Sequence, residues 1–166
     1  FFIDYNSCID KSARKLISTL YLSTFNIYML PEILIKNIFS LTKNNKRASL
    51  SLGIVFNNDG IVVSSELVQS VIKTDFQLNY EDADELIDYA PKEEEDLSII
   101  SKILQKRNLL RMKLGAREIL ESYGKIIVKN DIPIIRVIEP TLSRQLISEA
   151  MILYGDIISN FAKVNK

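Results

Sequence analysis

The stretch Leu142–Phe161, LSRQLISEAMILYGDIISNF, has the clearest amphipathic pattern in the chain. Its apolar residues recur at the three- and four-residue spacing that places them on one side of an α-helix. They are Leu142, Leu146, Ile147, Ala150, Met151, Tyr154, Ile158 and Phe161. The sequence therefore predicts a long helix here.

Two β-hairpins are predicted before this helix. Each joins two segments rich in β-branched residues through a turn of Asn, Asp or Gly, the residue types that accept positive φ. The first turn is Asn57-Asn58-Asp59-Gly60, and the second contains Asn130 and Asp131. The four expected strands are Ser49–Phe56, Ile61–Lys73, Lys125–Val128 and Ile134–Ile138.

Further helices are predicted between and before the hairpins. Asp10 is the expected N-cap of the first, in which Ala13, Leu16, Ile17 and Leu20 recur at helical spacing. A short helix is expected from Pro31, then an acidic helix and a long helix at Tyr80–Tyr89 and Glu93–Gly115. The order predicts one α+β domain, with a mixed or antiparallel sheet of hairpins packed against several helices.

Composition excludes several classes of protein. Lys plus Arg equals Asp plus Glu at 21 each, so no global field attracts polyanions, although a local basic channel remains open. With no histidine and only Cys8, the chain offers neither a Ser–His–Asp triad nor an intrachain disulfide, and a zinc site is not expected. No apolar run approaches the roughly 18–20 residues of a membrane span. Because the first residue is Phe1, we expect a processed chain or a segment of a longer one.

The long helix carries a candidate basic stripe. At about 100° per residue, Lys102, Lys106, Lys113 and Arg117 fall within an arc of roughly 60° if the helix reaches Arg117. Such a stripe suits phosphates, although a solvated face is the alternative. Arg107 and Arg111 fall closer to the apolar arc, so each is expected to snorkel, to pair with a carboxylate or to face an internal RNA path.

The acidic clusters are not expected to bind metal. Asp82, Asp84, Glu85 and Asp88 alternate on a helix, which points their side chains to different faces. The Glu93–Asp96 run is interpreted as a favourable charge cluster at a helix N-terminus. We therefore expect no metal ligands in the chain.

Several short motifs, in order along nearly the whole chain, resemble one family. They are Ser7-Cys-Ile-Asp10-Lys-Ser-Ala, Tyr21-Leu22, Met29-Leu30-Pro31-Glu32, Arg47-Ala48-Ser49-Leu50-Ser51, Asp59-Gly60, Leu78-Asn79-Tyr80-Glu81, Arg111-Met-Lys-Leu-Gly115-Ala116 and Leu146-Ile147-Ser148-Glu149-Ala150-Met151. They are similar to the S-x-L-D-x-x-A, Y-L-P, M-L-P-E, R-x-A-L-S, D-G, L-T-Y-E, R-x-x-x-G-A-L and L-I-E-E-x-M patterns of the ribonuclease II and ribonuclease R catalytic (RNB) domain. Prolines of the family pattern are lost at Ser23 and Tyr28, and Ser148 replaces its first L-I-E-E carboxylate.

The resemblance implies that residues 1–166 are an internal, partial RNB-type exoribonuclease domain. The family hydrolyses single-stranded RNA from the 3′ end to nucleoside 5′-monophosphates, using Mg²⁺. Its aspartate cluster for magnesium lies upstream of these motifs, and its catalytic arginine segment lies downstream. No catalytic residue is therefore expected within the chain, which alone should not cleave RNA. A monomeric enzyme of a bacterial cytoplasm or a plastid is implied, with no membrane partner.

The resemblance also implies which residues bind RNA. Tyr21 matches a tyrosine that stacks on the 3′-terminal nucleotide; by pattern alone it is a half-buried tyrosine at a helix end. Tyr80 and Glu149 match a pair associated with preferring RNA over DNA, through hydrogen bonds to a ribose 2′-OH. By pattern alone Glu149 is a solvated helix residue. Arg47 matches an arginine near the substrate path, and Arg107 and Arg111 complete the expected RNA contacts.

Two other hypotheses remain. A degenerate relative could bind RNA or a protein partner without catalysis, and a helical scaffold unrelated to RNA would make the ordered motifs a coincidence. Retention of Tyr21, Tyr80 and Glu149 together favours the enzyme. The enzyme hypothesis predicts that these three side chains converge on one groove wide enough for unpaired RNA.

Overall fold

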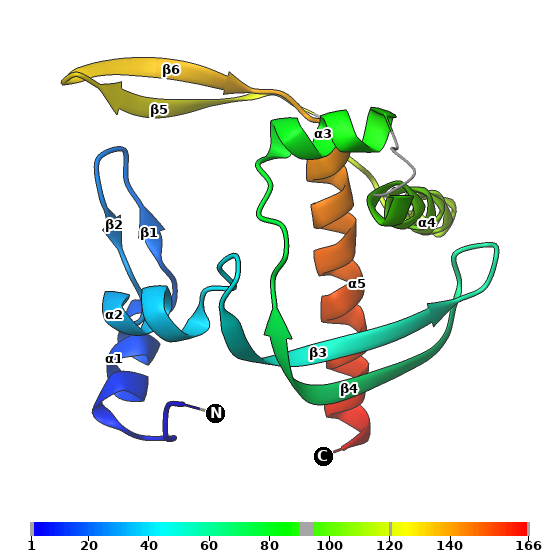
Figure 1. Ribbon diagram of the computed structural model, residues 1–166, viewed down its shortest axis with the longest axis horizontal. Coiled ribbons are helices and arrows are strands. Elements are labelled where there is room, and N and C mark those ends of the chain that lie inside the picture. Colours follow the sequence, from blue (N-terminus) through cyan, green and yellow to red (C-terminus); the bar gives the residue numbers. More distant parts are fainter. Residues whose placement is uncertain (1, 90–94, 120, 166) are drawn as a thin grey trace. The chain divides into compact units, whose positions relative to one another are not determined.

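The computed structural model describes residues 2–89, 95–119 and 121–165, in which helices alternate with small antiparallel sheets (Figure 1). The predicted α+β class is confirmed. The strands form three separate two-stranded sheets: β1 (Leu20–Tyr21) with β2 (Asn26–Ile27), β3 (Lys46–Phe56) with β4 (Val62–Lys73), and β5 (Tyr123–Lys129) with β6 (Ile132–Ile138). The helices are α1 (Cys8–Leu16), α2 (Glu32–Leu34) with a following π-helical turn (Ile35–Phe39), α3 (Tyr80–Tyr89), α4 (Glu95–Lys113) and α5 (Leu142–Val164).

The chain divides into two compact units. Unit 1 comprises Phe1–Ser49, Val71–Asp75 and Tyr123–Ile138. Unit 2 comprises Leu50–Ser70, Phe76–Ser122 and Glu139–Lys166. Unit 1 therefore holds α1, the β1–β2 and β5–β6 hairpins and α2, whereas α3, α4 and α5 belong to unit 2. Strands β3 and β4 contribute residues to both.

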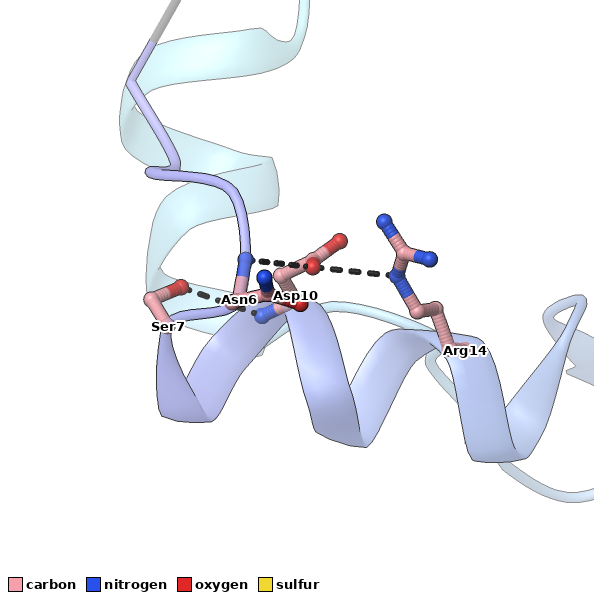
Figure 2. Close-up of polar contacts among 4 residues, drawn as sticks. All are labelled: Asn6, Ser7, Asp10 and Arg14. Atoms are coloured by element: carbon pink, nitrogen blue, oxygen red, sulfur yellow. Dashed lines mark hydrogen bonds and ion pairs between the residues drawn. The ribbon is translucent and has the colours of Figure 1, made fainter.

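Helix α1 begins at a reciprocal cap (Figure 2). Ser7 Oγ accepts a hydrogen bond from the Asp10 amide at 3.2 Å, and Asp10 Oδ2 accepts one from the Asn6 amide at 2.8 Å. The arrangement is a variant of the capping box. The Asn6 amide first, and then the Arg14 guanidinium, lower the pKa of Asp10. The prediction that Asp10 is the N-cap was wrong, because Ser7 occupies that position.

Helix α1 ends earlier than its apolar spacing predicted. Ile17 adopts a φ of 66°, a left-handed conformation that stops the helix after Leu16. Leu20 instead pairs with Ile27 in the β1–β2 hairpin, and Thr19 Oγ1 accepts a hydrogen bond from the Met29 amide at 3.2 Å. The extension of the helix to Leu20 was therefore wrong, since strand pairing determines the backbone there.

The two predicted hairpin turns are confirmed. In the first, Asn57 Oδ1 accepts hydrogen bonds from the Asp59 amide at 3.0 Å and the Ile61 amide at 2.9 Å, and Gly60 has a φ of 80°. In the second, Asn130 and Asp131 take φ values of 52° and 61° between the paired residues Lys129 and Ile132.

The first hairpin turn packs tightly against α4 within unit 2. A Cβ at Gly60 would lie 3.0 Å from Lys106 Cβ and 3.4 Å from the Arg107 amide nitrogen, so no larger residue fits without movement. Lys106 Nζ also donates a hydrogen bond to the Asn58 carbonyl at 2.6 Å. Gly60 is thus required both by its conformation and by the close approach of the helix.

The helices of unit 2 pack around the N-terminal half of α5 (Figure 1). Leu104 of α4 and Leu153 of α5 are buried, and the small buried residues Ser98 and Ser101 let α4 approach its neighbours closely. Helix α4 ends at Lys113, short of the predicted Gly115; Glu93 and Glu94, at its predicted start, lie outside the described residues. Among the described helices, none has the length and apolarity needed to cross a membrane.

The start of α5 is capped by a residue of α3. Thr141 occupies the N-cap position without a side-chain cap, while Asp84 Oδ1 accepts a hydrogen bond from the Ser143 amide at 2.8 Å. Partial burial raises the pKa of Asp84, but the hydrogen bonds from Ser143 and Thr141, with the nearby charge of Arg144, outweigh it and lower the pKa overall. A carboxylate at this helix end also complements the macrodipole.

Replacing Asp84 with Ala is expected to lower the free energy of unfolding at pH 7 by about 1–2 kcal/mol, because the first turn of α5 loses its cap. A lowered pKa contributes stability above the unfolded value of about 3.9, and this contribution is lost as the pH falls through the folded value. The difference between wild type and Asp84→Ala, measured by urea unfolding, should therefore shrink between pH 7 and pH 3. Asp84→Asn serves as the uncharged control. A difference that does not change with pH would contradict the role of the carboxylate.

Candidate nucleic-acid interface

Glu149 of α5 is held by Arg111 of α4 in a bidentate ion pair. Arg111 Nε lies 3.0 Å from both Oε1 and Oε2, and its Nη2 lies 2.8 Å from Oε2. Glu149 is only 4% exposed, whereas the Arg111 side chain is 31% exposed. The prediction from pattern alone that Glu149 is solvated was wrong. For Arg111, pairing with a carboxylate was one of the three predicted outcomes and is confirmed.

A small pocket lies beside this pair, between the facing sides of α4 and α5. Its volume of about 20 Å³ can hold a single water or hydroxyl group. It is lined by Ser101, Leu104, Gln105 and Asn108 of α4 and by Leu142, Gln145, Leu146 and Glu149 of α5. Asn108 Oδ1 is buried and has no hydrogen-bond partner among the described residues. Asn108 Oδ1 and the Glu149 carboxylate are both acceptors, so a hydrogen-bond donor in the pocket would have partners on its lining.

Tyr80 lies at the first residue of α3, against the start of α5. Its carbonyl accepts a hydrogen bond from Ser143 Oγ at 3.1 Å. Arg144 places its Cζ 3.9 Å from the centre of the Tyr80 ring, which is the geometry of a cation–π contact. The tyrosine is 38% exposed. One ring face is therefore occupied by a guanidinium, whose positive charge is brought next to the phenol.

Tyr80 and Glu149 belong to the same unit, and Ser143, the residue of α5 that contacts Tyr80, lies on a different side of α5 from Glu149. Glu149 follows Ser143, which contacts Tyr80, by six positions. In an α-helix this corresponds to a rise of about 9 Å and a turn of about 120° around the axis. Tyr80 of α3 thus contacts the first turn of α5, and Glu149 lies in the following turns of the same helix.

Tyr21 lies in unit 1, in the second position of β1, where it pairs with Asn26. Its side chain is 76% exposed, so the ring has a face available for stacking. The half-buried position predicted from pattern alone was wrong. Because Tyr80 and Glu149 belong to unit 2, the convergence of all three residues stays a prediction.

Arg47, also in unit 1, donates side-chain hydrogen bonds to two backbone carbonyls. Its Nε donates to the Ser40 carbonyl at 3.2 Å, and its Nη1 donates to the Lys46 carbonyl at 3.3 Å. These bonds tie the start of β3 to the segment that follows the π-helical turn. A guanidinium has five N–H donors, so Arg47 can make these bonds and still offer others.

Arg107 lies one turn before Arg111 on α4 and lines a groove of about 530 Å³. The groove runs between the β3–β4 hairpin and α5, and Glu66 and Asp156 line it together with apolar residues. Arg107 Nε is buried and, within the described part of the chain, has no hydrogen-bond partner. An unpaired buried donor is costly, so this nitrogen favours an acceptor from outside the chain.

The predicted basic stripe does not extend to Arg117. Helix α4 ends at Lys113, and Gly115, with a φ of 99°, follows its end. Lys106 donates to the hairpin carbonyl of Asn58, whereas Lys102 and Lys113 are exposed. The stripe was predicted only for a helix that reaches Arg117, and this condition is not met, because α4 ends four residues before Arg117.

No described group of three or more His, Cys, Asp or Glu side chains is arranged to hold a metal ion. Asp84 is one of the four acidic residues of α3 that were considered as metal ligands, and it caps the N-terminus of α5.

Sequence reasoning missed Arg144 and Asn108, and it considered Asp84 only as a metal ligand and not as a helix cap. A cation–π contact and a cap supplied by another helix depend on which helices meet, and neither has a signature in local spacing. Ser143 gave the one local indication of a polar contact at the start of this helix, because serine is a common capping residue near helix N-termini.

Comparisons with known proteins agree on one family. The RNB domain model matches residues 1–166. An uncharacterized ribonuclease of Synechocystis is 32% identical over 159 residues, which are 95% of this chain and 24% of that protein. The chloroplastic/mitochondrial ribonuclease II of Arabidopsis thaliana is 28% identical over 166 residues, which are 96% of this chain and 21% of the relative. The chain thus spans about a quarter of the length of these relatives.

Solved structures show the same fold. RNase R of Mycoplasma genitalium, in complex with ribose-methylated single-stranded RNA, matches with a TM-score of 0.90 at 21% identity, over 99% of this chain and 27% of that one. Yeast Ssd1, described as a pseudonuclease, matches with a TM-score of 0.65 at 19% identity, over 89% of this chain and 18% of that one. Since the family model covers every residue and the fold agrees, the chain belongs to the RNB domain family.

Proposed function

We propose that this chain is the RNA-contacting part of a 3′-to-5′ exoribonuclease that hydrolyses single-stranded RNA to nucleoside 5′-monophosphates. The relatives named above include a ribonuclease II, and the proposal extends their activity to the protein that contains residues 1–166. Under it, the chain is a partial catalytic domain. The aspartates that hold magnesium and the catalytic arginine then lie in segments upstream and downstream. A bacterial cytoplasm or a plastid is the proposed compartment.

The observation that carries the proposal is the buried carboxylate of Glu149. A buried ion pair is a weak source of stability, because the cost of desolvating both charges offsets their attraction. In other proteins, replacing a buried ion pair with apolar residues of similar volume is often neutral or stabilising. Keeping Glu149 charged at 4% exposure therefore favours a function for its oxygen atoms.

The available hydrogen-bonding positions fit a ribose hydroxyl. Oε1 of Glu149 accepts one N–H from Arg111, while Oε2 accepts two, so Oε1 has a further lone pair for an O–H donor. The adjoining pocket has the volume of one hydroxyl group. A 2′-OH distinguishes RNA from DNA, and Glu149 is proposed to accept its hydrogen bond.

The two tyrosines are proposed to contact the nucleotides. Tyr21 presents an exposed ring that can stack on any base, so it would hold the 3′-terminal nucleotide without reading sequence. Tyr80 would offer its hydroxyl to a ribose, with Arg144 behind the ring adding positive charge near the backbone. Arg47 and Arg107 are proposed as phosphate contacts.

The rival function is that of a non-catalytic relative that binds RNA or a protein partner. Ssd1 shows that a protein described as a pseudonuclease shares this fold. The likeness to RNase R and to Ssd1 concerns the fold alone, so cleavage itself must decide between them.

Cleavage of a 3′-labelled RNA oligonucleotide by the complete protein, with magnesium, tests the proposal. We expect labelled nucleoside 5′-monophosphate as the first product. Glu149→Ala and Tyr80→Phe should lower the ratio of RNA to DNA cleavage rates by at least about tenfold each, because each removes a hydrogen bond to the ribose. Lys163→Ala, at the exposed end of α5, is the control. RNA binding without any product would support the rival, and an unchanged ratio in both variants would contradict the ribose role.

Arg107 yields a separate prediction about phosphates. If its unpaired Nε meets a phosphate oxygen, Arg107→Ala should weaken RNA and DNA binding alike. It should also reduce the magnitude of the salt slope, the change of log K with log salt, by about one phosphate contact, roughly 0.7 for a single strand. Fluorescence anisotropy at several salt concentrations measures both. An unchanged salt slope would contradict the phosphate contact, and it would indicate that Arg107 interacts with Glu66 or Asp156, the carboxylates that line its groove.

A further inference from the structure

Arg111 and Arg107 are the same residue type, one turn apart on α4, but their environments differ. Arg107 Nε is without a partner among described residues, whereas Arg111 Nε and Nη2 are both committed to Glu149. The sequence placed both in one group of RNA-binding arginines. The structure therefore separates an arginine with a free donor from one that binds a carboxylate.

The contact between Arg111 and Glu149 fixes the orientation of the carboxylate. Nε reaches both carboxylate oxygens and Nη2 adds a second bond to Oε2, so the planar fork restricts rotation of the carboxylate about its last bond. A lysine ammonium is a point charge and cannot hold both oxygens in one plane. As a result, Oε2 is saturated by Arg111 and Oε1 is the oxygen with a vacant lone pair.

We propose that Arg111 is a positioning residue for RNA selection: it aims Oε1 of Glu149 at the ribose 2′-OH and does not itself bind phosphate. This inference rests on the proposed ribose contact of Glu149. Arg111 acts on selectivity between RNA and DNA through the carboxylate, whereas a phosphate-binding arginine acts equally on both nucleic acids.

Binding measurements on the complete protein in EDTA test this role apart from catalysis. Fluorescence anisotropy gives the Kd of an RNA oligonucleotide and of the DNA oligonucleotide of the same sequence, at several salt concentrations. The variants are Glu149→Gln, Arg111→Lys and Arg111→Gln, with Lys163→Ala as the exposed control. Arg111→Lys keeps the charge that neutralises Glu149, and Arg111→Gln keeps an N–H donor if the lysine variant fails to fold. Circular dichroism confirms which variants are folded.

The positioning role predicts that Glu149→Gln and the folded Arg111 variant each lower the ratio of DNA to RNA Kd by at least about tenfold, with the salt slope unchanged. If Glu149→Gln lowers the ratio while the Arg111 variant weakens RNA and DNA equally and flattens the salt slope, Arg111 is a phosphate contact and the inference is overturned. If Glu149→Gln leaves the ratio unchanged, the ribose contact itself fails, and the positioning role fails with it.

Discussion

The burial of a single charge is the constraint on which unit 2 depends. Glu149 lies between two helices, where an unpaired carboxylate would cost several kcal/mol, so α4 must place an arginine opposite it. Arg111 meets this need only if α4 faces α5 with one particular side. The same side then brings Leu104 into the interior, and Arg107, one turn earlier, into the groove beside the β3–β4 hairpin. One orientation of α4 thus satisfies the ion pair, the burial of Leu104 and the placement of Arg107 together.

The N-terminal end of α5 is held by polar contacts with α3. Asp84 and the carbonyl of Tyr80 both bind Ser143, so the first turn of α5 is fastened to the first two turns of α3. This contact brings Arg144 beneath the Tyr80 ring. Tyr80 and Glu149, the two residues of unit 2 proposed to contact the ribose, are therefore held by contacts between helices. Their partners are as important as the residues themselves, because a ribose hydroxyl is recognised only by groups held in place.

Local sequence patterns correctly predicted the turns and helices whose formation depends on neighbouring residues in the chain. The turn at Asn57–Gly60 and the helix Tyr80–Tyr89 follow from residues that favour positive φ and from an acidic first turn. Predictions failed where a distant partner decides. Leu20 continues a helical spacing but pairs with Ile27, and Glu149 has the polarity of a surface residue but is buried against Arg111. The family resemblance selected Tyr80 and Glu149 but not Arg144, because its motifs record residue types and not their contacts.

The central claim is that Glu149 accepts a hydrogen bond from a ribose 2′-OH. It is tested most directly by a double-mutant cycle that combines a change in the protein with a change in the RNA. Affinity is measured for wild type and Glu149→Gln with RNA carrying a single 2′-deoxy substitution, moved one nucleotide at a time from the 3′ end. The account predicts a coupling energy of at least about 1 kcal/mol at one nucleotide and additive effects at all others. Additive effects at every nucleotide would contradict it.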